Sequence, residues 1–300
     1  MLRYQKIAKT MSRRIINPIL FDVSLRDGIQ GADPTQYSTD TKKTIFMDIR
    51  TKYSPPKMEI GSFVSPKVLP IMEDTTELID FCSKKSREED NRPDLYVLVP
   101  NKKGLLDAIR CGAKNFSFIT SVSNEFQLKN TRRSLDYKKN EFQELMEIVS
   151  TSRPNSYTKL YISCVNECPI SGLIDRDFII YEILSSYGLV DYDGERYIDE
   201  ICLSDTMGTL RAHDFEYIVD GLLRFGLAKN RISLHLHIGK DNLVDAKRIL
   251  FACFKRGINR FDVSAIKEGG CSVSMDRANL KPNMTYEFFY ETLFEYNSDT

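Results

Sequence analysis

The 300-residue sequence lacks a net charge, a long apolar run and a nucleotide-binding glycine motif. Lysine plus arginine and aspartate plus glutamate both number 42, so we expect no broad basic surface that would attract nucleic acid. The longest apolar runs span only a few residues, far fewer than the roughly 20 that cross a bilayer. We therefore predict neither a nucleic-acid-binding protein nor a membrane protein.

The seven cysteines are an odd number, and no apolar signal segment precedes them. Both observations favour reduced thiols in a cytoplasmic protein without a structural disulfide. The compartment has one alternative, because residues 1–18 carry five basic side chains and no acidic residue comes before Asp22. This arm is either a mitochondrial presequence or a solvated lead-in to the first strand.

Short apolar runs alternate with amphipathic stretches, which predicts alternating strands and helices. The predicted strands are Ile19–Val23, Lys57–Ile60, Leu95–Val99, Asn115–Ile119, Leu160–Ser163, Glu200–Leu203, Ile232–Leu236 and Arg260–Ser264. Helical periodicity is clearest at Thr39–Lys52, Leu135–Thr151, Arg176–Tyr187, His213–Phe225 and Leu243–Arg256. Glycines stand where caps would end helices, at Gly112, Gly188, Gly226 and Gly257.

Strand–helix units repeated to a count of eight predict an α/β fold, a single-domain (β/α)8 TIM barrel. We place this catalytic domain at residues 19–300, after the basic arm at residues 1–18, because no linker-like stretch divides it. An open doubly wound sheet would show the same alternation of strands and helices. No glycine-rich motif of the dinucleotide-binding type supports that alternative.

Two of the three histidines, His235 and His237, lie two residues apart in an alternating polar and apolar run. Successive side chains of a strand leave on opposite faces, so these two imidazoles share one face. A pair of converging imidazoles is half of a metal site. The alternative is a polar strand face whose histidines are held by carboxylates.

Polar residues follow several of the predicted strands, at the rim where the functional groups of a barrel lie. Arg26 and Asp27 come after the first strand, Glu59 lies near the end of the second, and Ser204–Gly208 follows the sixth. The eighth strand runs into Glu268–Cys271. We expect these side chains to gather beside the two histidines.

Longer stretches of the chain resemble 3-hydroxy-3-methylglutaryl-CoA (HMG-CoA) lyase, a metal-dependent lyase of TIM-barrel fold. The most specific are Met58–Lys67, which reads MEIGSFVSPK, and Arg26–Gln30, which reads RDGIQ. The resemblance continues in the family's order through Val99–Gly104, Cys111–Lys114, Ser163–Pro169, Leu203–Gly208 and Gly269–Cys271. It implies an enzyme that takes an acyl-CoA substrate and cleaves HMG-CoA to acetoacetate and acetyl-CoA through an enolate. It also implies that the protein can form a homodimer.

The resemblance also implies a set of metal ligands. Asp27, His235, His237 and Asn279 would hold the divalent cation. A carboxylate, two imidazoles and an amide, with no thiolate among them, suit Mg²⁺ or Mn²⁺ as the cofactor.

The same resemblance implies catalytic roles for five residues. Arg26 would stabilise the enolate oxygen, and Glu59 would orient Arg26 or a water on the metal. Asp205 or His235 would take the hydroxyl proton, and Asp205 is also placed to cap a helix. Cys271, in the Gly-Gly-Cys loop, would protonate the leaving enolate carbon.

The chain departs from the family at several positions. Ile238 stands where the family has an aspartate after the second histidine, so we expect the chain to lack a carboxylate that could orient the imidazoles. The loop around Cys271 differs on both sides, and the chain ends about 20 residues after Asn279, so we expect most of the family's last helices to be absent. Two alternatives stay open: a related Claisen-type synthase or aldolase acting on another acyl-CoA or 2-oxo acid, and a non-catalytic barrel descendant.

Overall fold

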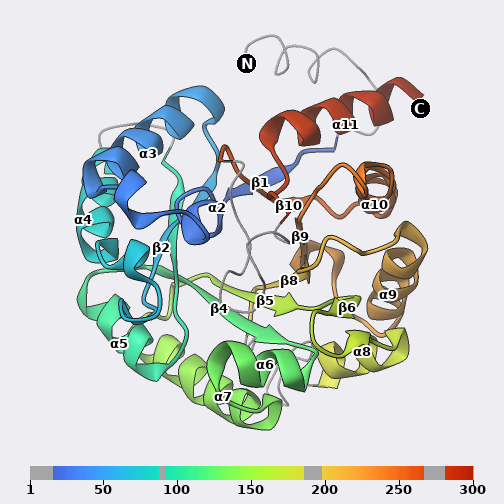
Figure 1. The fold of residues 1–300 in the computed structure, drawn as a ribbon, viewed down its shortest axis with the longest axis horizontal. Helices are drawn as coiled ribbons and strands as arrows, with labels where there is room; N and C mark the ends of the chain where they lie inside the picture. Colours follow the sequence, from blue (N-terminus) through green and yellow to red (C-terminus); the bar gives the residue numbers. More distant parts are fainter. Residues whose placement is uncertain (1–15, 88–91, 186–197, 267–280, 300) are drawn as a thin grey trace.

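Eight parallel strands close into a barrel at the centre of the molecule (Figure 1). The computed structural model describes residues 16–87, 92–185, 198–266 and 281–299. The strands are β1 (Ile19–Asp22), β2 (Lys57–Ser62), β3 (Asp94–Leu98), β4 (Asn115–Ser121), β5 (Thr158–Ser163), β8 (Glu200–Asp205), β9 (Ile232–Leu236) and β10 (Arg260–Val263). Their order around the barrel is β1-β10-β9-β8-β5-β4-β3-β2. The prediction of a (β/α)8 barrel is confirmed.

Helices follow the strands in sequence and form a ring around the barrel (Figure 1). They are α3 (Thr39–Tyr53), α4 (Thr75–Arg87), α5 (Lys102–Arg110), α7 (Leu135–Ser152), α8 (Arg176–Ile183), α9 (Ala212–Arg224), α10 (Leu243–Arg256) and α11 (Tyr286–Asp299). Several begin at a side chain that accepts a hydrogen bond from a backbone amide, as Ser38 does for α3 and Ser134 for α7. No helix among the described residues has the length and apolar character of a membrane span.

The C-terminal region contributes one full helix to this ring. Its helix α11 lies between α10 and α3 (Figure 1), and the expectation of a shortened C-terminal region stays a prediction. The Tyr286 ring stacks on Tyr53 of α3 at 3.8 Å between centroids, and Phe289 packs against Phe254 and Phe261. The described part of the C-terminal region therefore helps to cover the first and last strands.

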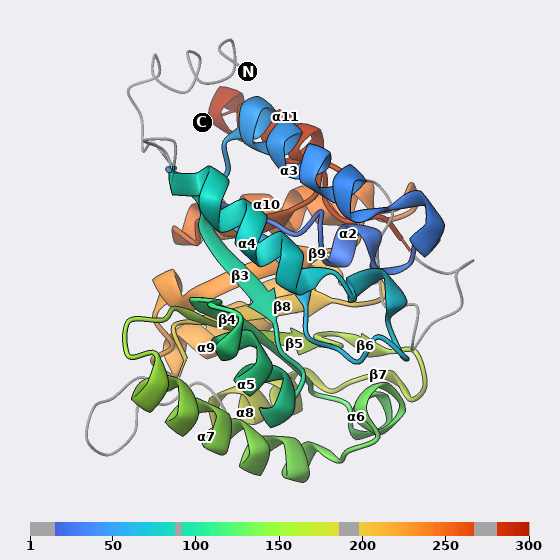
Figure 2. The same ribbon diagram turned by 90° about the vertical axis from the view of Figure 1, so that its left-hand side faces the viewer.

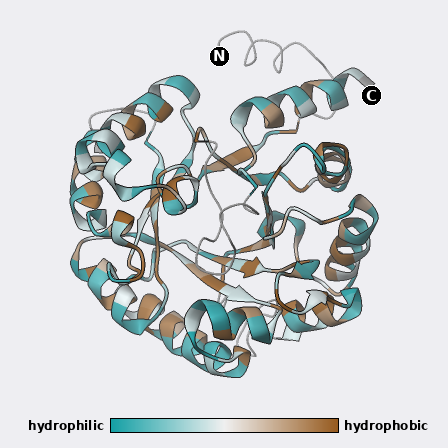
Figure 3. Cartoon of the chain, in the orientation of Figure 1, coloured by the Kyte–Doolittle hydropathy of each residue, from teal (hydrophilic) through white to brown (hydrophobic). Residues whose placement is uncertain are grey.

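The core lies between the strands and the helices. Alternate strand residues point outward and are fully buried, such as Leu160 and Ile162 of β5 and Leu234 of β9. The helices turn their apolar faces toward these residues and their polar faces to solvent (Figure 3). The other strand face points into the barrel, where Lys159, Glu200 and Asp262 are buried with aromatic side chains.

Short elements project from the end of the barrel at which the strands finish. They are α2 (Asp27–Gln30), η1 (Pro34–Gln36), η2 (Pro70–Met72), α6 (Asn124–Thr131), and the hairpin of β6 (Glu167–Cys168) with β7 (Gly172–Leu173). Figure 2 shows α2, α6 and the hairpin on the same side of the molecule. A further short turn, η4 (Lys229–Arg231), leads into β9 from the opposite end. The projecting elements surround the opening where the predicted site residues lie.

Candidate metal and active site

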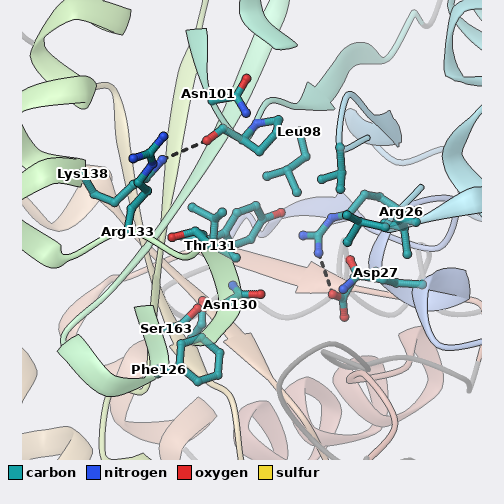
Figure 4. Close-up of a pocket in the computed structure, with 18 of the residues that line it drawn as sticks. Arg26, Asp27, Leu98, Asn101, Phe126, Asn130, Thr131, Arg133, Lys138 and Ser163 are labelled. Atoms are coloured by element: carbon teal, nitrogen blue, oxygen red, sulfur yellow. Dashed lines mark hydrogen bonds and ion pairs between the residues drawn. The ribbon is translucent and has the colours of Figure 1, made fainter. Parts of the chain in front are cut away.

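A cavity of about 520 Å³ opens at the carboxyl end of the barrel strands. Its inner wall includes Arg26, Asp27, Ser163, His235 and His237. Figure 4 shows Arg26 and Asp27 on one side of this cavity. The side chains that the sequence places after different strands therefore converge on one space, as the parallel arrangement of the strands requires.

Asp27, His235 and His237 form a buried triad within this cavity. Their ligand atoms all lie within 4.8 Å of one another, and each residue is buried. Oδ2 of Asp27 is 3.4 Å from Nε2 of His237 and 3.7 Å from Nε2 of His235. Among the described residues, Oδ2 of Asp27 and Nε2 of His237 find no hydrogen-bond partner. These two buried atoms lie 3.4 Å apart, and each could give a lone pair to a divalent cation bound between them.

Both imidazoles are held from behind through Nδ1. Nδ1 of His235 lies 3.1 Å from Oδ2 of Asp262, and Nδ1 of His237 lies 3.0 Å from the backbone oxygen of Asp205. A carboxylate and a carbonyl only accept, so each Nδ1 donates and each Nε2 keeps its lone pair for the triad. The expectation that no carboxylate orients the histidines is wrong: Ile238 supplies none, but Asp262 of β10 does.

Neighbouring charges keep Asp27 ionised, and burial keeps His235 neutral. Burial alone would raise the pKa of Asp27, but the Arg26 guanidinium and the two imidazoles outweigh it and hold the pKa well below its usual range. Burial lowers the pKa of His235, and the hydrogen bond to Asp262 only partly offsets this effect. For His237, burial is outweighed by Asp27, which raises the pKa. An ionised Asp27 and a neutral His235 are the states that metal ligands need, whereas an ion bound through Nε2 of His237 would displace the proton that Asp27 favours there.

Arg26 is fixed in place by three neighbours. Its Nε donates to Oε2 of Glu59, and its Nη1 donates to Oδ1 of Asp27 at 2.6 Å. The guanidinium also lies over the Tyr161 ring, 4.8 Å from the centroid, and the Tyr161 hydroxyl donates to the same oxygen of Glu59. Arg26 is 4% exposed, so it presents a preorganised cation to the cavity rather than a solvated surface charge.

The Asp205 carboxylate serves the turn after β8. Its two oxygens accept from the backbone amides of Thr209 and Leu210 at 3.0 and 3.1 Å, and Asp205 does not line the cavity. The turn needs Gly208, whose φ is +64° and where a Cβ would come within 2.6 Å of the His237 backbone oxygen. Asp205 therefore holds the turn before α9 and does not cap the helix, because α9 begins at Ala212 with Arg211 as its N-cap.

A buried ion cluster below the triad was not predicted from the sequence. Lys159 is fully buried, donates to Oδ1 of Asp262 and lies 3.0 Å from Oε1 of Glu200. Arg260 and Lys57 lie 3.1 and 3.7 Å from the other oxygen of Glu200. Charged residues at positions of a strand that face the barrel interior were the available signal, because such side chains must be paired once buried.

The outer wall of the cavity is basic. Lys102, Lys103, Arg133 and Lys138 line it, and Figure 4 places Arg133 and Lys138 across the cavity from Arg26. Nζ of Lys138 donates to the Pro100 backbone oxygen at 2.9 Å. Glu141 also lines the cavity and pairs with Lys138. Together with the buried triad, the lining therefore carries more cations than carboxylates, which suits an anionic ligand.

Two residues of the predicted site lie outside the described residues. Cys271, the predicted proton donor, and Asn279, the predicted fourth metal ligand, both fall within residues 267–280. Of the remaining predicted residues, the structure brings Arg26, Asp27 and Glu59 together with His235 and His237, and it engages the Asp205 carboxylate elsewhere.

Known proteins of similar sequence include hydroxymethylglutaryl-CoA lyases. Hydroxymethylglutaryl-CoA lyase YngG of Bacillus subtilis (strain 168) is 29% identical over 253 residues, which cover 83% of this chain and 77% of that protein. The mitochondrial hydroxymethylglutaryl-CoA lyase of Bos taurus is 26% identical over 252 residues, which cover 84% of this chain and 71% of that protein.

Among solved structures, a Bacillus subtilis HMG-CoA lyase matches with a TM-score of 0.78 at 24% identity, covering 95% of this chain and 88% of that one. An HMG-CoA lyase from Acinetobacter baumannii, solved with coenzyme A and 3-methylmalate, matches with a TM-score of 0.77 at 24% identity, covering 95% and 86%. These two matches support the barrel fold. The family model named HMGL-like matches residues 17–265, and the chain belongs to that family.

Proposed function

We propose that this protein is a divalent-metal-dependent carbon–carbon lyase that cleaves HMG-CoA to acetoacetate and acetyl-CoA. The observation that carries the proposal is the buried triad of Asp27, His235 and His237 beside the fixed guanidinium of Arg26. The HMG-CoA lyases among the relatives at 24–29% identity support the same reaction and the same substrate class.

The triad is proposed to hold Mg²⁺ or Mn²⁺, with Asn279 as a further ligand. Oxygen and nitrogen donors without a thiolate fit these ions, and the two orphaned donor atoms of Asp27 and His237 are what such an ion would satisfy. When bound, a divalent cation supplies Lewis-acid polarisation of the tertiary hydroxyl of the substrate.

Arg26 and Glu59 act on the negative charge that moves into the thioester. Cleavage of the carbon–carbon bond places a pair of electrons in a thioester enolate, and Arg26 is the fixed cation that would face its oxygen. Glu59 accepts from Nε of Arg26 and from Tyr161, so it keeps the guanidinium from collapsing onto Asp27 alone. Cys271 remains the proposed donor of the proton to the enolate carbon.

His235 is the better placed of the two predicted bases. It lines the cavity, whereas both oxygens of Asp205 already accept amide hydrogen bonds. Nε2 of His235 is also a proposed metal ligand, and one lone pair cannot bind an ion and a proton together. We therefore keep His235 in both predicted roles: with Asp27 and His237 it would hold the ion, and it would take the hydroxyl proton only through an Nε2 that is free of the ion.

The basic mouth is proposed to receive the coenzyme A portion. Arg133 and Lys138 lie across the cavity from Arg26 (Figure 4), and together with Lys102 and Lys103 of the lining they would meet the phosphates of coenzyme A. A cavity that runs from this mouth to the triad would place the reacting carbon beside Arg26.

The test is to incubate the purified protein with Mg²⁺ or Mn²⁺ and HMG-CoA and to measure acetoacetate. We expect product, and we expect Asp27→Ala and Cys271→Ala each to remove most of the rate. No product, but exchange of solvent deuterium into acetyl-CoA or pyruvate, would favour a related synthase or aldolase. Neither signal, with no ion at His235 and His237 in crystals soaked in Mn²⁺, would favour a non-catalytic barrel.

The compartment and the assembly stay predictions. Bacterial and mitochondrial relatives both exist, and the basic arm at residues 1–18 lies mostly outside the described residues. We retain the cytoplasm as the proposed compartment, with the mitochondrion as the alternative. The proposed homodimer is checked by light scattering at several protein concentrations.

A further inference from the structure

The carboxylate of Asp262 has three polar neighbours, all of them buried. Oδ1 accepts from Nζ of Lys159, and Oδ2 faces Nδ1 of His235 at 3.1 Å and the Cys202 thiol at 3.7 Å. Asp262 and Lys159 are 2% and 0% exposed. Water therefore does not compete for these contacts, and their geometry is set by the register of the barrel strands.

The two histidines of the triad are supported unequally. His237 donates through Nδ1 to a neutral peptide oxygen, that of Asp205, at 3.0 Å. His235 donates to a charged carboxylate, which is itself held by a buried ammonium group. A charge-assisted hydrogen bond is about twice as strong as a neutral one, so the ring of His235 is the more firmly oriented of the two.

We propose that Asp262 and Lys159 are positioning residues that lock His235 in the Nδ1-protonated tautomer and aim its Nε2 lone pair at Asp27. Lys159 draws Oδ1 of Asp262 toward itself, which leaves Oδ2 facing the imidazole. Neither residue lines the cavity, so both act through His235 rather than on substrate. This inference rests on the proposed function for the identity of the ligand, a divalent cation.

Nitrogen-15 NMR of the metal-free protein tests the tautomer directly. The chain has only three histidines, and His213 is 75% exposed on α9 beside Asp214, so its signals can be told from those of the buried pair. We expect the His235 signals of the wild-type protein to report protonated Nδ1 and unprotonated Nε2. A mixture of the two tautomers of His235, or a protonated Nε2, would overturn the proposal without any variant being made.

Variants test the consequence for the ion. Measured with Mn²⁺ alone by electron paramagnetic resonance, the dissociation constant should rise about 10- to 100-fold in Asp262→Asn and in Lys159→Met. Lys159→Arg should restore most of the affinity, because it keeps a buried cation beside Asp262. The matched control is Asp22→Asn, which makes the same chemical change at a buried side chain of β1 that bonds Ser24 and Tyr286 of α11 instead of a histidine.

The outcomes separate this inference from the proposed lyase activity. An unchanged Mn²⁺ dissociation constant and an unchanged His235 spectrum in Asp262→Asn would overturn it, as would an equal loss of affinity in Asp22→Asn. If the wild-type protein shows the locked tautomer and the variants lose Mn²⁺ affinity as expected, but the wild type releases no acetoacetate, only the proposed function fails. In an active enzyme, saturating Mn²⁺ should restore much of the kcat of Asp262→Asn.

Discussion

Arg26 and Glu59 form an ion pair from which water is excluded, so removing one partner should cost far more than removing both. Their side chains are 5% and 0% exposed, and Nε of Arg26 donates to Oε2 of Glu59. Arg26→Met would leave two buried carboxylates, Glu59 and Asp27, without the cation they share. Breaking a buried pair in this way costs about 3–5 kcal/mol, whereas replacing both partners by apolar side chains is often nearly neutral.

Urea unfolding of four proteins measures this difference: the wild type, Arg26→Met, Glu59→Leu and the double variant. We expect each single variant to lose about 3–5 kcal/mol of unfolding free energy and the double variant to lose clearly less than the sum. The double variant still leaves Asp27 without its cation, so its loss should stay above zero. Additive losses, within about 0.5 kcal/mol, would show that the two side chains are not coupled and would refute the reasoning.

The same four proteins separate stability from catalysis. If Arg26 stabilises the enolate, Arg26→Met and the double variant should both lose about 10²- to 10³-fold in kcat, although the double variant regains stability. Acetoacetate release at saturating HMG-CoA and Mn²⁺ is the assay. Recovery of activity in the double variant would mean that Arg26 is needed only to neutralise Glu59.

The remaining predictions concern pH, metal and substrate. Burial raises the pKa of Asp22 from 3.8 to about 6, so the native state holds this proton more tightly than the unfolded chain does. The stability that this group contributes is present below about pH 4 and is lost as the pH rises through 6. The stabilisation by Asp22→Asn should therefore be about 1 kcal/mol larger at pH 8 than at pH 5. An equal effect of Asp22→Asn on the free energy of urea unfolding at both pH values would contradict this. Mn²⁺ at about 100 times its dissociation constant should stabilise the wild type by about 2.7 kcal/mol, EDTA should reverse the effect, and Asp27→Ala should show none of it in thermal unfolding. Arg133→Ala should raise the KM for HMG-CoA and leave kcat unchanged in steady-state kinetics, whereas a matching fall in kcat would assign Arg133 a part in the chemistry.

The barrel could be predicted from the sequence because an apolar run marks each strand and a stretch of helical periodicity separates most strands from the next. Apolar runs mark each strand, and the observed strands begin and end within two residues of the predicted ones; β9 has the predicted bounds. An element too short to show a periodicity was not predicted. The hairpin of β6 and β7 has two residues in each strand, which is too short for any period to show, and it was not predicted.

The candidate site was less predictable, because the position of a residue in the sequence does not show which groups its side chain contacts in the folded protein. Asp205 follows its strand as a catalytic carboxylate would, yet it bonds two amides of its own turn. Asp262 lies within a predicted strand, but its contact with His235 depends on how β10 sits against β9, which only the folded barrel sets. Lys159 precedes the predicted start of its strand, so its burial inside the barrel was not expected.

The triad also bridges the place where the barrel joins its two ends. Asp27 follows the first strand of the chain, His235 belongs to the seventh strand around the ring, and β10, the last strand, pairs with both β1 and β9. A cation shared by Asp27 and the histidines would link the loop after the first barrel strand to the seventh, across the point where the barrel closes. Ligand binding and ring closure would then reinforce each other, so the free energy of one contributes to the other.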